Sequence, residues 1–90
     1  MQEPYDIEIG DKLRKKIDKL QSKDIQYYNA VIDKILQIAK VPQLGKPLSG
    51  ILKGNRRVHV GPFVLIYKVD DNLHVVTLLE FAHHDDAYKH

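Results

Sequence analysis

Two side chains able to do chemistry share one face of a short β-prone segment in the second half of the chain. Arg57 and His59 alternate with Val58 and Val60, so a strand here would turn the valines to the core and both polar groups to one outer face. An imidazole titrates near neutral pH and can take or give a proton, and a guanidinium can hold an oxyanion through two parallel hydrogen bonds. This face is suited to acid–base chemistry beside an anionic group.

Positive charge is concentrated around this segment, although the formal net charge of the chain is only +2. No acidic residue occurs over residues 45–68. The same stretch contains five cations: Lys46, Lys53, Arg56, Arg57 and Lys68. Such an uneven distribution indicates an anionic partner. The chain has no cysteine, which excludes a thiolate nucleophile, a disulfide framework and a cysteine-based zinc site.

The rest of the pattern predicts the elements that must position these groups. Ninety residues are enough for one modest core and too few for two, so we expect a single domain over residues 1–90. Apolar spacing indicates a strand at 5–9, helices at 11–20 and 24–39, and strands at 57–60, 63–69 and 73–81. This order predicts an α+β domain of the form βααβββ, with an antiparallel sheet backed by an N-terminal helical hairpin.

Three local patterns refine this prediction. Residues 63–69 are almost wholly apolar, which indicates a central strand covered on both faces. Simple alternation along the last strand would place Phe81 on the face opposite Val76 and Leu78. Two prolines and three glycines over residues 41–54 indicate an ordered loop with no helix. The sheet face away from the helices is expected to stay open.

No apolar run approaches the ~20 residues that span a bilayer, and the first residues lack a basic segment followed by an apolar one. We therefore expect a cytoplasmic chain with no membrane partner. The lysine-rich outer side of the first helix is expected to be a solvated face.

Short motifs occur in a fixed order along the run KPLSGILKGNRRVHVGPFVLIYKV, which is followed by an apolar strand and AHHDDAY. In this order and spacing they resemble toxins of the RelE/ParE superfamily, and the resemblance covers nearly the whole chain. It is greatest to the RelE and YafQ type, because YafQ-like toxins have histidines in segments that match His59 and His84. The resemblance implies a RelE-like, microbial-ribonuclease-like fold.

This resemblance implies a type II toxin that cleaves messenger RNA on the ribosome, inhibits translation and is neutralised by a cognate antitoxin. Cleavage by the 2′-hydroxyl of the RNA needs a base, an acid and cations for the growing phosphorane charge, without a metal or other cofactor. His59 and His84 would be the base and the acid, in either order, and Arg57 would hold the phosphate. Further RNA contacts would come from Lys46, Lys53, Arg56 and Tyr88.

Two departures from the pattern leave an alternative open. RelE-like toxins usually have an arginine where this chain has Val64, and the aspartate that YafQ-like proteins carry after the turn proline is missing. The chain could therefore be a ParE-like gyrase poison, or a catalytically inactive relative that binds an antitoxin. Gyrase poisoning needs no acid and base, so the pair His59 and His84 favours the nuclease.

Overall fold

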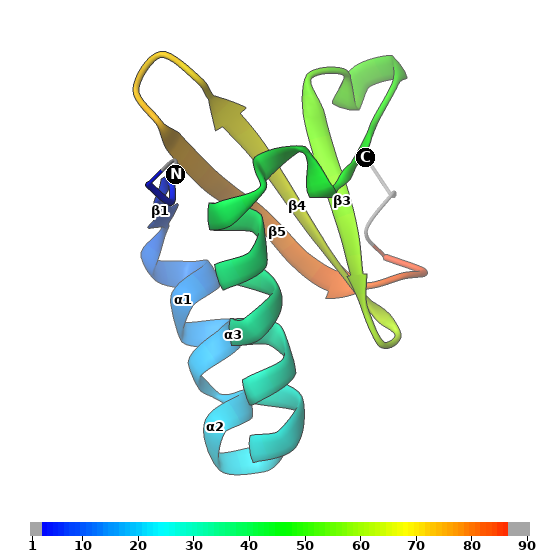
Figure 1. Cartoon of the computed structure of the whole chain (residues 1–90). Coiled ribbons are helices and arrows are strands. Elements are labelled where there is room, and N and C mark those ends of the chain that lie inside the picture. Colours follow the sequence, from blue (N-terminus) through cyan, green and yellow to red (C-terminus); the bar gives the residue numbers. More distant parts are fainter. Residues whose placement is uncertain (1–2, 87–90) are drawn as a thin grey trace.

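The computed structural model describes residues 3–86, and Figure 1 shows a twisted sheet with helices packed against one face. The sheet has the strand order β1-β5-β4-β3-β2. Its strands are β1 (Asp6–Ile9), β2 (Lys46–Pro47), β3 (Asn55–Val60), β4 (Phe63–Asp70) and β5 (Val75–His83). The predicted α+β class and the central place of the apolar strand β4 are confirmed.

The sheet is mixed, so the prediction of a fully antiparallel sheet was wrong. β1 runs parallel to β5, with Asp6 opposite Val75 and Ile9 opposite Leu78. The other neighbouring strands are antiparallel. Parallel neighbours need a long connection between them. Here that connection contains the three α-helices and the other three strands of the described chain. The alternation within the β1 segment indicated a strand, but it did not indicate which strand β1 pairs with or in which direction.

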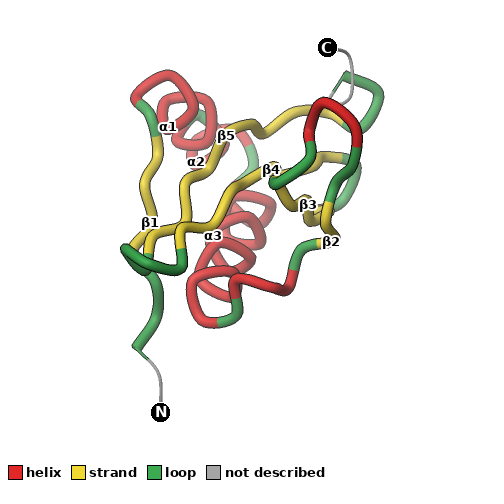
Figure 2. The backbone as a smooth tube through the Cα atoms, turned by 90° about the horizontal axis from the view of Figure 1, so that it is seen from above, coloured by secondary structure: helices red, strands yellow, loops and turns green. Residues whose placement is uncertain are grey.

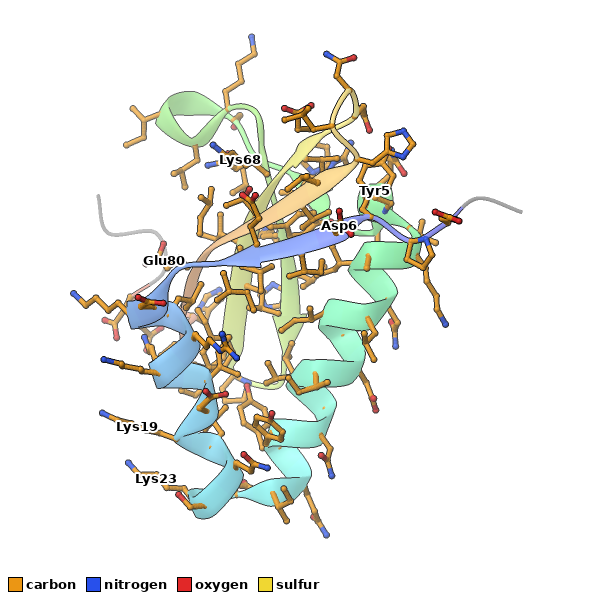
Figure 3. The ribbon with its side chains drawn as sticks, turned by 90° about the vertical axis from the view of Figure 1, so that its left-hand side faces the viewer. Tyr5, Asp6, Lys19, Lys23, Lys68 and Glu80 are labelled. Atoms are coloured by element: carbon orange, nitrogen blue, oxygen red, sulfur yellow. The ribbon has the colours of Figure 1, made fainter. Side chains whose placement is uncertain are left out.

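The predicted helical hairpin is present. α1 (Asp11–Asp18) is continued by the short α2 (Leu20–Lys23), and α3 (Ile25–Lys40) returns beside them along the sheet (Figure 2). Asp24 begins α3 by accepting a hydrogen bond from the Tyr27 backbone N–H over 3.0 Å. Lys19, which lies between α1 and α2, and Lys23 at the end of α2 both point outward (Figure 3). Within residues 3–86, no helix has both the length and the hydrophobicity needed to cross a membrane.

The segment expected to lack helix contains two three-residue 3₁₀ turns, so that prediction was wrong. They are η1 (Pro42–Leu44) and η2 (Gly50–Leu52), on either side of β2. Pro42 suits the first position of η1, because a proline has no N–H to leave unpaired there. In η2 the backbone N–H of Lys53 donates to the Gly50 carbonyl over 3.1 Å. Such short turns have no apolar periodicity to detect.

The main core lies between α3 and the sheet. Its fully or nearly fully buried side chains include Val31, Ile35, Ile38, Val58, Leu65, Tyr67, Val76, Leu78 and Phe81. A smaller cluster of Val64, Ile66 and Ala82 occupies the other sheet face, with Leu48 packed against it. β4 is therefore covered on both faces, as predicted. The far face is only partly open, because the loop that carries Leu48 covers its centre.

A β-bulge changes the facing of the end of β5. Tyr67 of β4 lies opposite Leu78 and Ile66 lies opposite Glu80, so Leu79 is an extra residue without a partner in the register. Beyond the bulge Phe81 joins Leu78 in the core and is only 2% exposed. The prediction that Phe81 lies on the face opposite Leu78 was therefore wrong. The bulge reverses the alternation for every later residue.

Candidate active site

β3 turns Arg57 and His59 to one face of the sheet, as the alternation in its sequence indicated. Val58 and Val60 are buried in the core, and His59 is exposed on the far face of the sheet. Nη1 of Arg57 lies 2.6 Å from Nε2 of His59. A guanidinium has only donors, so Nε2 is the acceptor of this hydrogen bond, and the ring proton is then on Nδ1. Without a bound substrate, the Nε2 lone pair of His59 therefore accepts a hydrogen bond from the Arg57 guanidinium.

His84 lies next to Arg57 and His59, although it is far from both in the sequence. The ring centroids of His84 and His59 are 5.8 Å apart, with 29° between the ring planes. The backbone N–H of His84 donates to the Pro62 carbonyl over 2.9 Å, which joins the end of β5 to the β3–β4 turn. The bulge at Leu79 is what turns this part of the chain to the far face. The structure thus brings Arg57, His59 and His84 together.

Asp85 is a neighbour of the site that sequence reasoning missed. Its Oδ1 lies 3.6 Å from Nδ1 of His84, and its Oδ2 lies 3.6 Å from Nδ1 of His83. The Asp85 backbone N–H also donates to Nδ1 of His83 over 3.2 Å. The only signal in the sequence was adjacency to two histidines. The His83 ring also lies edge-on to Phe63, with ring centroids 5.7 Å apart.

The other cations predicted to bind RNA are divided between two faces. Lys46 is exposed and lies directly opposite Arg57 in the β2–β3 pair, so the two side chains share the far face. Lys53 is exposed between η2 and β3. Arg56 belongs to the helix-side face, where its Nη1 donates to the Gly45 carbonyl at 2.7 Å and to the Gln43 carbonyl at 3.4 Å. Tyr88 lies outside the described residues.

A buried tyrosine holds the segment that carries Lys46. The Tyr67 hydroxyl accepts from the Gly45 N–H and donates to the Pro42 carbonyl, both over 2.7 Å. Burial raises the pKa of Tyr67 above its ordinary value, against the opposing effects of the Gly45 hydrogen bond and the Arg56 charge. With the hydrogen bonds of Arg56, these contacts fix η1 and β2 against the edge of β3.

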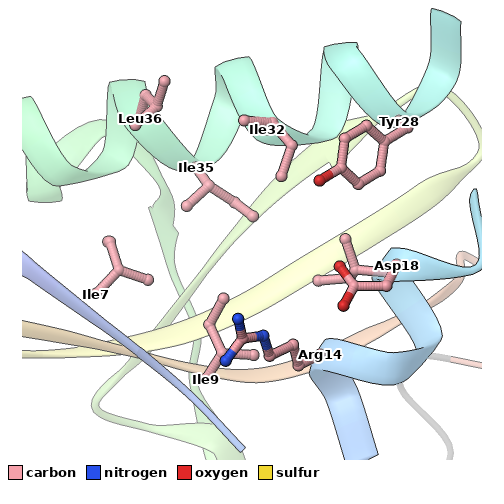
Figure 4. A pocket seen from close by; sticks show the side chains of 9 residues that line it. Ile7, Ile9, Arg14, Asp18, Tyr28, Ile32, Ile35 and Leu36 are labelled. Carbon is pink, nitrogen blue, oxygen red and sulfur yellow. The ribbon is translucent and has the colours of Figure 1, made fainter. Parts of the chain in front are cut away.

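The candidate site is an open surface rather than a deep pocket. The hollow in Figure 4, of about 470 Å³, lies between α1, α3 and β1 on another part of the molecule. Ile7, Ile9 and Ile32 line it, and Arg14 and Asp18 are at its side. None of the candidate catalytic residues lines this hollow. In the described part of the chain, no group of three or more histidine and acidic side chains is placed to hold a metal ion.

The family model described as the ParE toxin of type II toxin–antitoxin systems, parDE, matches residues 7–88. The chain belongs to this toxin family. A protein of Methanocaldococcus jannaschii named "Putative toxin RelE4" is 37% identical over 86 residues, which are 94% of this toxin and 92% of that protein. The predicted membership of the RelE/ParE superfamily is confirmed.

Solved structures agree with the fold of the toxin. A chain of the toxin–antitoxin complex RelBE2 from Mycobacterium tuberculosis superposes with a TM-score of 0.75 at 27% identity, over 89% of this toxin and 98% of that chain. YafQ from E. coli strain BL21(DE3) superposes with a TM-score of 0.66 at 24% identity, over 94% of this toxin and 99% of YafQ. The likeness to YafQ shows the RelE-like fold alone.

Proposed function

We propose that this toxin is an endoribonuclease that cleaves messenger RNA on the ribosome and so inhibits translation. The observation that supports it is the approach of His59 and His84, two imidazoles 5.8 Å apart beside the Arg57 guanidinium. A catalytic hydrogen bond spans roughly 2.6–3.2 Å, so each ring could reach one of two oxygens bound to the same phosphorus atom. Such a pair fits proton transfer to and from a phosphodiester.

The contact between Arg57 and His59 favours His59 as the base. When a phosphate takes the donors of Arg57, Nε2 of His59 is released to accept the proton of the 2′-hydroxyl. The 2′-oxygen then attacks phosphorus and the bond from phosphorus to the 5′-oxygen breaks. His84 gives that oxygen a proton, which leaves a 2′,3′-cyclic phosphate and a 5′-hydroxyl end. Arg57 stabilises the additional negative charge on the phosphorane.

The open surface fits a substrate that is aligned by a larger partner. Lys46 shares the face of Arg57, and Lys53 is exposed nearby in the chain, so both suit contacts with the RNA backbone. The ribosome would align the messenger RNA, and this alignment could supply much of the rate enhancement that the few catalytic groups do not provide. Arg56 is engaged with backbone carbonyls, so its predicted RNA contact is not part of this proposal.

A cognate antitoxin is the second partner that we propose. The solved relative from Mycobacterium tuberculosis comes from a toxin–antitoxin complex. Acidic residues of an antitoxin could approach Arg57 and Lys46 on the far face, where no ion pair between these cations and a described carboxylate is found. If Arg57→Glu abolished toxicity but left antitoxin affinity unchanged, direct covering of the site would be wrong and neutralisation would work through bulk.

The deciding experiment is to express the toxin without its partner and to map the 5′ ends of messenger RNA. New 5′-hydroxyl ends within translated regions are expected, and they should disappear when translation initiation is blocked. A His59→Ala/His84→Ala double variant is the matched control. Equal cleavage by that variant would contradict the acid–base pair.

A second candidate function is poisoning of DNA gyrase, which the match to the ParE family and the absence of the RelE-type arginine at Val64 favour. It predicts stalled gyrase–DNA complexes in place of RNA ends. Gyrase supercoiling measured with purified toxin separates the two functions. The double histidine variant should still act on gyrase if this candidate is right, because no acid or base is needed.

A further inference from the structure

A tyrosine of α3 contacts the strand end that carries His59. The hydroxyl of Tyr27 donates to the carbonyl oxygen of Val60, the last residue of β3. Burial raises the pKa of this hydroxyl above its ordinary value, so it remains a donor throughout the neutral range. His59 directly precedes Val60, so this hydrogen bond restrains the end of the strand from which the His59 ring projects.

The same tyrosine supports the turn that holds His84. Gly61 follows Val60 with φ +60°, and a Cβ added to Gly61 would lie 3.3 Å from the Tyr27 ring, so the turn rests on that ring. The next residue, Pro62, offers the carbonyl that accepts the His84 backbone N–H. One side chain therefore contacts Val60 and Gly61, the two residues between His59 and Pro62.

The Tyr27 ring also belongs to an aromatic cluster beneath the end of β5. Its centroid lies 5.8 Å from that of Phe63 and 6.5 Å from that of Phe81. Phe63 stacks on Phe81 at 4.9 Å, and His83 packs edge-on to Phe63. The β3–β4 turn and the end of β5 lie at the same end of the sheet in Figure 1. α3 thus supports both strand ends through Tyr27.

We propose that Tyr27 is a positioning residue that sets the separation of His59 and His84. This inference rests on the proposed nuclease function. Tyr27 acts through the Val60 carbonyl and the turn, and does not contact the RNA. Its ring packs against Phe63 and Phe81 and keeps the aromatic cluster intact. Its hydroxyl fixes the distance of the β3–β4 turn from α3 through the hydrogen bond to Val60. Removing the hydroxyl would leave the fold in place and let the turn, with both histidines, shift.

The test is Tyr27→Phe, which keeps the ring and removes only the hydroxyl. The expected result is a fall in kcat of about 10-fold with KM unchanged, because small misplacements of catalytic groups are costly while the cations that bind RNA remain. The pH profile of cleavage should also change shape. Tyr28→Phe is the matched control, since Tyr28 is the next residue of α3 and lines the hollow beside α1 instead. It should leave kcat and the profile unchanged.

A second measurement uses the protein without RNA, so it does not depend on the nuclease proposal. The imidazole NMR signals of His59 and His84 should shift in Tyr27→Phe and not in Tyr28→Phe, while His74, which stacks on Tyr5, serves as an internal reference. Thermal unfolding followed by circular dichroism identifies a temperature at which all the variants are folded, and the NMR spectra are recorded there. If the wild-type toxin does not cleave RNA, the nuclease proposal fails and these signals alone decide the positioning role. Unchanged signals in folded Tyr27→Phe would overturn it.

Discussion

The backbone N–H of His84 donates a hydrogen bond to the carbonyl oxygen of Pro62 over 2.9 Å, and this bond joins the end of β5 to the β3–β4 turn. This bond explains how a histidine close to the C-terminus can be held beside a strand residue. The His84 side chain is 57% exposed, so packing alone does not fix the orientation of its ring. Its place beside His59 depends on the β3–β4 turn and on the bulge in β5.

We expect His59→Ala and His84→Ala each to abolish most growth arrest and RNA cleavage while leaving the protein folded, because both side chains are exposed. The double variant should be little worse than either single one, since groups that act as a unit are strongly non-additive. Cleavage by the wild type should depend on pH with a bell shape, because one imidazole must be neutral and the other protonated. Mapped 5′ ends and single-turnover rates measure both effects.

His74→Ala is the control for the histidine variants. His74 stacks on Tyr5 with ring centroids 4.8 Å apart and belongs to the β4–β5 turn, apart from the site. It should retain cleavage. Ribosome-dependent cleavage at the wild-type rate by the double variant would remove both histidines from the mechanism and leave Arg57 with electrostatic stabilisation.

The placement of Arg57 and His59 could be predicted from sequence because alternation is a local property. Val58 and Val60 can be buried only if their neighbours face outward, and the structure has this arrangement. The two helices were predictable for the same reason, since their apolar residues recur at helical spacing. These predictions needed no knowledge of how strands pair.

The position of His84 could not be predicted from alternation, which would have turned residue 84 to the face of Val76 and Leu78. The insertion of Leu79 depends on how β5 pairs with β4, and nothing within the strand itself marks it. The contacts of Arg56 were hidden for a similar reason. Its carbonyl partners belong to η1 and the following glycine, a segment whose path is set by the buried Tyr67 hydroxyl.

Gly45→Ala should destabilise the protein. A Cβ at this position would meet the Tyr67 hydroxyl and lie 2.9 Å from the Arg57 carbonyl, so the loop or the strand must shift. Overpacking of this kind costs about 1–3 kcal/mol, and loss of the Tyr67 hydrogen bonds would add to it. The free energy of unfolding in urea measures the effect. Gly10→Ala is the control, since nothing lies within 4 Å of its added Cβ, and a free energy lowered equally in both variants would contradict the steric explanation.

Stability should fall in alkaline solution through Tyr67. Burial raises the pKa of Tyr67 in the folded protein, so the unfolded chain loses its phenolic proton first. This contribution is complete below the ordinary tyrosine value of about 10 and is lost as pH rises through the higher folded value. The free energy of unfolding, measured at increasing pH above about 9, should decline less steeply in Tyr67→Phe. Identical slopes in the two proteins would show that Tyr67 does not contribute.

Arg57 should contribute both charge and geometry to RNA binding. With a catalytically dead His84→Ala background, affinity for ribosomes carrying messenger RNA should weaken as salt rises, and Arg57→Ala should reduce the log–log slope by about 1 for one lost phosphate contact. Arg57→Lys should keep most of the slope yet, in the active background, lose cleavage by about 10-fold or more, because an ammonium cannot form the bidentate contact.

Arg14 provides the matched control for these Arg57 variants, since it is exposed beside the hollow between α1 and α3 and is apart from His59. Arg14→Ala and Arg14→Lys should leave the salt slope and the cleavage rate nearly unchanged. Full cleavage by Arg57→Lys would reduce Arg57 to a general positive charge. A salt slope that Arg14→Ala lowers as much as Arg57→Ala would mean that the toxin binds RNA through its overall charge and not through the face that carries His59 and His84.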